Sequence, residues 1–157
     1  MFVEVTEGFG FSAAHFVAGH EKCEYLHGHN WRVGMTVEGD EDEHGLVVDF
    51  LDIKRMLEKI CNAYDHRVLL PGKSPTLKIS KEGESTNISV CGREYKFPSA
   101  DVVLISAINT TVEEFARVIA DDLVKSLSAR PNVRKIKVLV EESPGQSAIE
   151  ERPVKTD

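Results

Sequence analysis

The stretch CEYLHGHNWRVGMTV, Cys23–Val37, predicts both a fold class and a kind of site. After His29, apolar residues occupy every second position and polar residues lie between them, which is the pattern of a half-buried β-strand. His29 shares the parity of the apolar side chains, so we expect it on the inward face. Gly28 carries no side chain, and it therefore allows the imidazoles of His27 and His29 to close on one ion. The stretch predicts a strand that begins with metal ligands.

A second strand is predicted upstream, over residues 2–15, and His15 ends it on the inward parity. If the two strands pair as a hairpin, His15 can lie opposite His29, and three neutral imidazoles would meet. Three protein ligands leave the fourth tetrahedral position of zinc open, as in catalytic zinc sites, whereas structural zinc sites are closed. His20 and His44 fall in predicted loops, and we interpret them as solvent-exposed.

Cys23 and Glu24 lie in a polar loop just before the histidine pair. A nearby cation stabilises a thiolate, so Cys23 is a candidate for a fourth metal ligand or for a base. Glu24 is a second candidate acid or base. These alternatives remain open from the residues alone.

The rest of the chain predicts two amphipathic helices and two further main strands. One helix is expected near 50–63, and the other begins at Thr111, where TVEE has the form of a capping box. Strands are expected at 133–142 and 147–151, while 71–100 is rich in turns with short alternating runs. Because the strands come in sequential pairs, we predict an α+β fold with an antiparallel sheet and both helices on one face. The exposed edges of such a sheet favour self-association.

Two further sites carry polar side chains where chemistry is plausible. Asp65 and His66 follow the first helix and can form a carboxylate–imidazole unit, although such dipeptides are usually surface residues.

Glu142 continues the inward parity of a buried strand, where an acid is costly unless it has a partner. It can accept two hydrogen bonds from a guanidine-like ring, or it can simply begin the following turn in solvent.

Composition excludes several classes of protein. The 157 residues predict a single domain, 1–157, and the net charge of −7 argues against nucleic-acid binding. No apolar run approaches the ~18 residues of a membrane span. The N-terminal segment has no basic region of a signal peptide, and the odd number of three cysteines favours a reducing cytoplasm.

Together these motifs resemble the 6-pyruvoyl-tetrahydropterin synthase / 6-carboxy-tetrahydropterin synthase family. They occur in the family's order along nearly the whole chain, apart from an insertion at about 71–106. The matching stretches are FSAAH, CEYLHGHN, GLVVDFLDIK, YDHRVLL, NTTVEEFA and VLVEES.

The resemblance implies the tunnelling fold, a β-β-α-α-β-β subunit whose sheets join into an oligomeric barrel, usually a homohexamer built as a dimer of trimers. It implies active sites between subunits and the following residue roles. Zn²⁺ ligands would be His15, His27 and His29; catalytic residues would be Cys23, Asp65 and His66; pterin-binding residues would be Glu142, Thr110 and Thr111.

The substrate implied by the resemblance is 7,8-dihydroneopterin triphosphate. Cys23, four residues before the first histidine of the pair, resembles the branch that forms 6-carboxy-5,6,7,8-tetrahydropterin with loss of acetaldehyde and triphosphate, on a queuosine-type pathway. Glu24 resembles a branch that cleaves the side chain to a 6-hydroxymethyl pterin for folate-type cofactors. We favour the carboxy-pterin reaction; the alternatives are the hydroxymethyl and the 6-pyruvoyl products. A different class, a non-catalytic zinc-stabilised oligomer, would use Cys23 as the fourth ligand.

Overall fold

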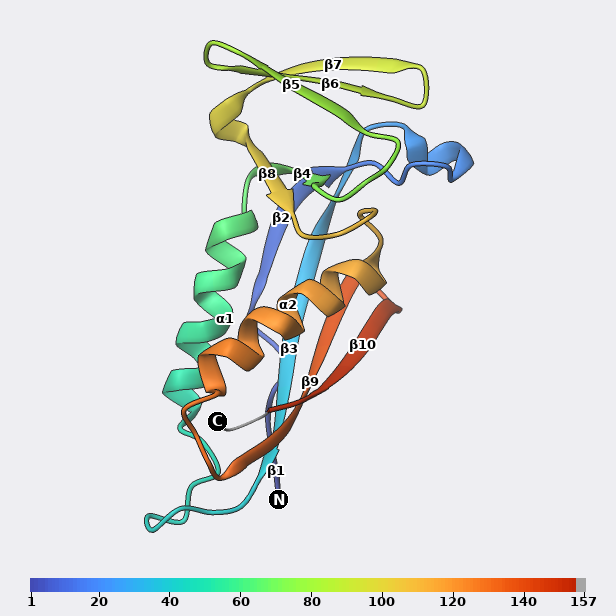
Figure 1. Cartoon of the computed structure of the whole chain (residues 1–157). Helices are drawn as coiled ribbons and strands as arrows, with labels where there is room; N and C mark the ends of the chain where they lie inside the picture. The colour runs from blue at the N-terminus through green and yellow to red at the C-terminus, as the bar shows by residue number, and fades with distance from the viewer. Residues whose placement is uncertain (155–157) are drawn as a thin grey trace.

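The computed structural model describes residues 1–154, and its main body has two layers, a curled sheet and a pair of helices (Figure 1). The strand order of the main sheet is β10-β9-β3-β2-β4-β8, and β1 pairs with β3 beyond the end of β2. The predicted α+β class is therefore confirmed. The elements of this body are β1 (Phe2–Val5), β2 (Gly10–His15), β3 (His27–Gly39), α1 (Phe50–Tyr64), β4 (Arg67–Pro71), β8 (Val102–Ile105), α2 (Val112–Leu127), β9 (Val133–Ser143) and β10 (Gln146–Pro153), with short 3₁₀ turns at Glu21–Glu24 and Ser99–Asp101.

The prediction of an antiparallel sheet is wrong at one side, because the sheet is mixed. β4 pairs in parallel with β2, and β8 pairs in parallel with β4. α1 carries the chain back along the sheet after β3, so β4 runs in the direction of β2. Both β4 and β8 are short, and neither has a long alternating pattern in the sequence.

The prediction of one continuous strand over residues 2–15 is also wrong. Val5 pairs with Met35 and Gly10 pairs with Arg32, so residues 6–9 lie opposite only residues 33 and 34 of β3. Such a bulge bends the strand. Gly10 is required where pairing resumes, since a Cβ there would lie 2.3 Å from the carbonyl oxygen of Trp31.

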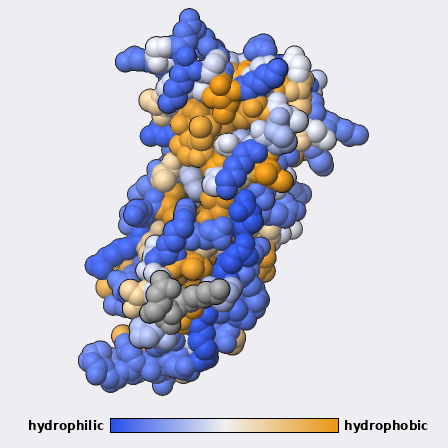
Figure 2. Space-filling view, viewed as in Figure 1, coloured by the Kyte–Doolittle hydropathy of each residue, from blue (hydrophilic) through white to orange (hydrophobic). Residues whose placement is uncertain are grey.

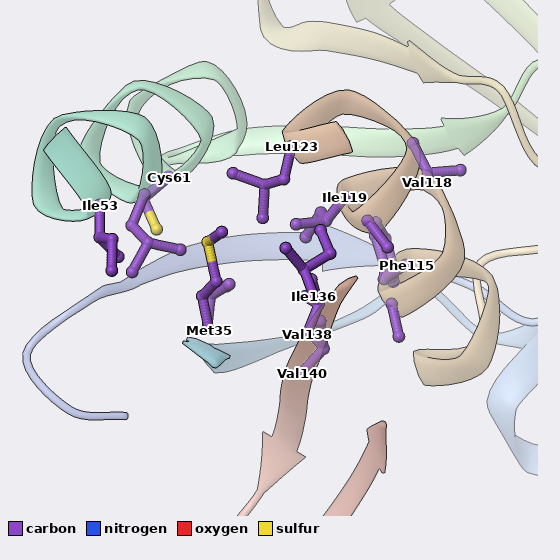
Figure 3. Close-up of a cluster of buried hydrophobic side chains, with 14 of the residues drawn as sticks. Met35, Ile53, Cys61, Phe115, Val118, Ile119, Leu123, Ile136, Val138 and Val140 are labelled. Atoms are coloured by element: carbon purple, nitrogen blue, oxygen red, sulfur yellow. The ribbon is translucent and has the colours of Figure 1, made fainter. Parts of the chain in front are cut away.

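Both helices pack on one face of the main sheet, as predicted, and the hydrophobic core fills the space between them (Figure 3). Asp49 caps α1 by accepting a hydrogen bond from the Leu51 amide, and the Thr111 hydroxyl caps α2 by accepting one from the Glu114 amide. The side chains that meet in Figure 3 come from β3, β9 and both helices. They include Met35, Ile53, Cys61, Phe115, Val118, Ile119, Leu123, Ile136, Val138 and Val140.

The predicted insertion contains a separate three-stranded antiparallel sheet, which lies beyond one end of the main sheet (Figure 1). Its strands are β5 (Lys78–Glu82), β6 (Ser85–Val90) and β7 (Arg93–Pro98). A second buried cluster joins this small sheet to the main body through Phe16, Leu70, Ile88 and Val90. The small sheet therefore packs against Phe16, the first residue after β2.

Apolar surface gathers below the small sheet, in the region of β8 (Figure 2). Leu104 of this edge strand is 52% exposed. An edge strand with an exposed apolar side chain can pair with another chain. Neither helix within residues 1–154 has the length and hydropathy needed to cross a membrane.

Candidate active site

Three histidines from the β2–β3 hairpin meet at the end of the helix-covered face. One ligand atom from each of His15, His27 and His29 lies within 4.8 Å of the others. The predicted pairing of His15 with His29 is wrong by two residues: His15 lies opposite His27, and Ala13 lies opposite His29. The histidines still converge, because a shift of two residues keeps each side chain on the same face.

The imidazoles of two of these histidines are oriented by backbone carbonyl groups. His15 Nδ1 donates to the carbonyl oxygen of Thr110 at 2.8 Å, and His27 Nδ1 donates to that of Tyr25 at 2.6 Å. A hydrogen on Nδ1 leaves Nε2 with a lone pair, which is the form that binds a metal. His15 Nε2 is buried and has no hydrogen-bond partner among the described residues.

The electrostatics of the cluster favour a neutral imidazole at its centre. Burial, reinforced by the neighbouring His27 and His29, lowers the pKa of His15 to about 4. His15 therefore carries no charge near neutral pH. Three imidazole nitrogens this close together fit a zinc ion, since zinc accepts nitrogen ligands and takes three protein ligands at an open site.

Glu142 reaches the histidine cluster from β9. Its Oε1 lies 3.5 Å from His15 Nε2 and 3.7 Å from His29 Nε2, and its side chain is only 22% exposed. The carboxylate thus faces the site, and the alternative in which it begins a solvated turn does not describe its position. Both distances are longer than an ordinary hydrogen bond, so the carboxylate can still accept hydrogen bonds from a ligand.

Cys23 and Glu24 lie in the loop between β2 and β3, in the 3₁₀ turn Glu21–Glu24. Neither residue belongs to the group of ligand atoms that the three histidines form. Cys23 is partly buried, and its carbonyl accepts a hydrogen bond from the Val17 amide at 2.7 Å. The Glu24 carboxylate accepts one from Gly19 N at 3.2 Å.

The small sheet supplies a contact that sequence reasoning missed. Arg93 Nη1 donates to Glu24 Oε2 at 2.9 Å, across 69 residues of sequence. This hydrogen bond, with a smaller contribution from the Cys91 side chain, lowers the pKa of Glu24. No local pattern predicts a pair between positions so far apart.

Asp65 and His66 form the expected carboxylate–imidazole pair beside β2. Asp65 Oδ1 accepts from Ser12 N at 2.8 Å, and Oδ2 accepts from His66 Nδ1 at 2.7 Å; the Ser12 hydrogen bond is the largest cause that lowers the pKa of Asp65. The His66 side chain is 81% exposed. The pair therefore lies at the surface of the protomer.

Two open hollows next to β2 are lined by His66. The larger, about 790 Å³, is lined by Asp65 and His66 but by none of the three clustered histidines. The smaller, about 490 Å³, is lined by both His29 and His66. The smaller hollow therefore has one residue of the dyad, His66, and one residue of the histidine cluster, His29, in its lining.

Thr110 and Thr111 lie beside the cluster but use their hydroxyl groups internally. The Thr110 hydroxyl donates to the Phe16 carbonyl, and the Thr111 hydroxyl caps α2. Asn109 is a further residue that sequence reasoning missed: its amide group exchanges hydrogen bonds with both Ala18 N and Ala18 O, each at 3.0 Å. This segment therefore anchors the loop that carries Cys23.

The model of the family described as 6-pyruvoyl tetrahydropterin synthase matches residues 4–153. The chain belongs to this family. A relative from Methanocaldococcus jannaschii, provisionally named 6-carboxy-5,6,7,8-tetrahydropterin synthase, is 31% identical over 144 residues, which cover 90% of this chain and 88% of the relative. A protein of Pyrococcus abyssi with the same provisional name is 32% identical and covers 85% of this chain and 80% of its own.

Solved structures of the 6-pyruvoyl tetrahydropterin synthase family match over the same length. The Plasmodium falciparum 6-pyruvoyl tetrahydropterin synthase has a TM-score of 0.90 and 33% identity, with 98% of each chain covered. Plasmodium vivax variants in which a catalytic glutamate is replaced by alanine or by cysteine match with a TM-score of 0.90 at 32% identity and the same coverage. Because the match covers 98% of both chains, the insertion at about 71–106 has a counterpart in these family members.

Proposed function

We propose that this chain is a zinc-dependent lyase that converts 7,8-dihydroneopterin triphosphate and one water to 6-carboxy-5,6,7,8-tetrahydropterin, acetaldehyde and triphosphate. The observation that carries the proposal is the group of three imidazole ligand atoms within 4.8 Å of one another. The names of the archaeal relatives support the carboxy-pterin product.

His15, His27 and His29 would hold the zinc ion, with Thr110 and Tyr25 carbonyls fixing two of the rings. The bound ion supplies Lewis-acid chemistry, which polarises the side-chain hydroxyls of the substrate and lowers their pKa. Glu142, beside the same atoms, would accept two N–H groups of the pterin ring and so set the position of the side chain.

The proton transfers are assigned to groups around this position. Cys23 would remove a proton from the substrate side chain, and His66, held by Asp65, would move a second one. Backbone groups of Thr110 and Thr111 would meet the edge of the ring, since both hydroxyls are already bonded within the protein.

The proposed assembly is a homohexamer, a dimer of trimers that closes the sheets into a barrel. Two features support this assembly. The edge strands β8 and β10 have unpaired backbone groups that another subunit can bind, and the exposed Leu104 of β8 can be buried in the same contact. The exposed position of His66 also suits an active site that a neighbouring subunit completes.

The second candidate product is 6-hydroxymethyl-7,8-dihydropterin. It is favoured by Glu24 and by the catalytic glutamate of the Plasmodium vivax relative, which indicates that a carboxylate can act in this family. A 6-pyruvoyl product is the third. The position of Cys23 outside the histidine cluster argues against a closed, non-catalytic Cys/His₃ zinc site.

The test is product analysis with the zinc-loaded protein and 7,8-dihydroneopterin triphosphate, followed by absorbance and mass spectrometry. The proposal expects the 6-carboxy pterin together with equimolar acetaldehyde and triphosphate. The absence of any 6-substituted pterin product from a protein that holds one zinc per chain would overturn it.

A further inference from the structure

The small sheet of the insertion is packed against the loop that carries Cys23 and Glu24. Phe16, which follows the metal-site residue His15, is buried against Tyr95 of β7, with the two rings stacked at 5.9 Å. Ile88 and Val90 of β6 complete the same buried cluster. This packing fixes the start of the loop relative to β6 and β7.

Arg93, the first residue of β7, holds the other end of the loop by two contacts. Its guanidinium donates to the Glu24 carboxylate at 2.9 Å and lies 4.2 Å from the centre of the Tyr25 ring. The Arg93 and Glu24 side chains are 26% and 23% exposed, so the pair is partly shielded from water. The next residues, Leu26 and His27, lead directly into the metal-site strand.

The Glu24 carboxylate is turned toward these partners. Gly19 N donates to its Oε1 and Arg93 donates to its Oε2, so both oxygens accept hydrogen bonds from the protein. A carboxylate that acts as a base must have a lone pair directed at the proton it removes. In this position Glu24 is held by the loop and the small sheet, and Cys23 beside it makes no such contact through its side chain among the interactions of the described residues.

We propose that Arg93 is a positioning residue that retains the Glu24 carboxylate and thereby determines which pterin product the site forms. This inference rests on the proposed function. With Arg93 in place, Cys23 removes the side-chain proton and the carboxy-pterin branch is followed. Without it, Glu24 is released and the hydroxymethyl branch competes.

The hydroxymethyl branch is a retro-aldol cleavage that needs only a base and a returned proton. The base removes the proton of the 2′-hydroxyl, the C1′–C2′ bond breaks, and C2′ becomes the aldehyde of glycolaldehyde triphosphate. The electron pair of that bond passes into the adjacent C6=N5 imine of the ring. Protonation at C1′ then restores the imine and yields 6-hydroxymethyl-7,8-dihydropterin, so no oxidant or reductant is required.

The experiment compares Arg93→Gln with Lys96→Gln. Lys96 lies on the same strand and also pairs with a glutamate, Glu82, at 2.9 Å, but this pair is exposed and contacts no residue of the Cys23 loop among the interactions of the described chain. Arg93→Gln is expected to raise the ratio of hydroxymethyl to carboxy product by about tenfold or more, the factor that corresponds to one charge-assisted hydrogen bond. Lys96→Gln is expected to leave the ratio unchanged.

Two further variants separate positioning from a general loss of structure. Arg93→Lys keeps the positive charge and should restore most of the wild-type ratio. Adding Glu24→Gln to Arg93→Gln should remove the gained hydroxymethyl product, because the released base is then absent. An unchanged product ratio in Arg93→Gln, with wild-type enzyme active, would overturn the inference while leaving the proposed function intact.

A measurement without substrate tests whether Arg93 holds the loop that carries Cys23 and Glu24. Hydrogen exchange of the amides in residues 17–26 should be at least about tenfold faster in Arg93→Gln than in wild type, and unchanged in Lys96→Gln. If the wild-type protein makes no pterin product but this difference is found, the proposed function fails and the contact is confirmed. If the exchange rates are equal, Arg93 does not hold the loop and the inference fails.

Discussion

His15 Nδ1 donates a hydrogen bond to the carbonyl oxygen of Thr110, a residue 95 positions away in the chain. The bond joins the end of β2 to the segment that begins α2, and it leaves His15 Nε2 directed into the histidine cluster. The orientation of a proposed metal ligand is thus controlled by a backbone group that no single substitution removes. The histidine cluster and the packing of α2 are coupled through this contact.

Loss of one clustered histidine should abolish stoichiometric metal binding. We expect His29→Ala to reduce zinc from one per chain to less than about a tenth at equal free zinc, because two imidazoles remain where zinc needs three protein ligands. Elemental analysis after gel filtration measures the zinc content per chain. His44→Ala, which removes an exposed loop histidine, is the matched control. Full zinc occupancy in His29→Ala would contradict the assignment.

The zinc-free protein should lose stability as the pH falls from about 6.5 toward 4. The folded state holds the pKa of His15 at about 4, below its ordinary value of 6.5, so the unfolded chain binds this proton first. The free energy of unfolding should therefore decrease through this window, by about 3 kcal/mol in total, and it should not change from this cause above pH 7. Urea unfolding at several pH values, compared with His15→Gln, gives the measurement. Equal pH slopes in both proteins would exclude His15 as the source.

Removing the charge of Glu142 should weaken substrate binding without removing the metal. We expect Glu142→Gln to raise KM by about 10- to 100-fold, the cost of charge-assisted hydrogen bonds to the ring, with zinc content unchanged. Glu141→Gln is the control, since its carboxylate accepts from Gly145 N outside the histidine cluster. Steady-state kinetics on both variants give the KM values. Equal KM values in Glu142→Gln and Glu141→Gln would count against a ring-binding role for Glu142.

Replacement of Cys23 should stop the carboxy-pterin reaction at the proton-transfer step. Cys23→Ala is expected to lower kcat by about 10²- to 10⁴-fold, the usual range for a general base, while zinc binding persists. Cys61→Ala removes a thiol that is buried in the core cluster and serves as the control. Retained kcat in Cys23→Ala, or loss of zinc from it, would show that the thiol has another role.

The sequence predicts those features that depend on the two-residue period of a strand. The inward parity of His15, His29 and Glu142 placed all three on the face where the structure has them. The predicted pairing of His15 with His29 was wrong by two residues, because the two-residue period fixes the face of a side chain but not the partner opposite it.

Features that depend on tertiary packing could not be predicted. The strands β4 and β8 are four or five residues long, and their parallel pairing depends on the path of α1 rather than on their own residues. The Arg93–Glu24 pair and the Asn109–Ala18 hydrogen bonds each join distant segments, so neither leaves a local pattern. The different surroundings of the two candidate bases, Cys23 and Glu24, are likewise visible only when the insertion is placed against the loop.

All three imidazoles lie between residues 15 and 29, on one hairpin, whereas Thr110 and Glu142 come from much later in the chain. Ribosomal synthesis therefore produces all three proposed zinc ligands well before the residues that orient His15 and face the cluster. If the histidines bind zinc as proposed, the ligand set is complete on one local hairpin, and metal uptake would not have to wait for the C-terminal half of the chain.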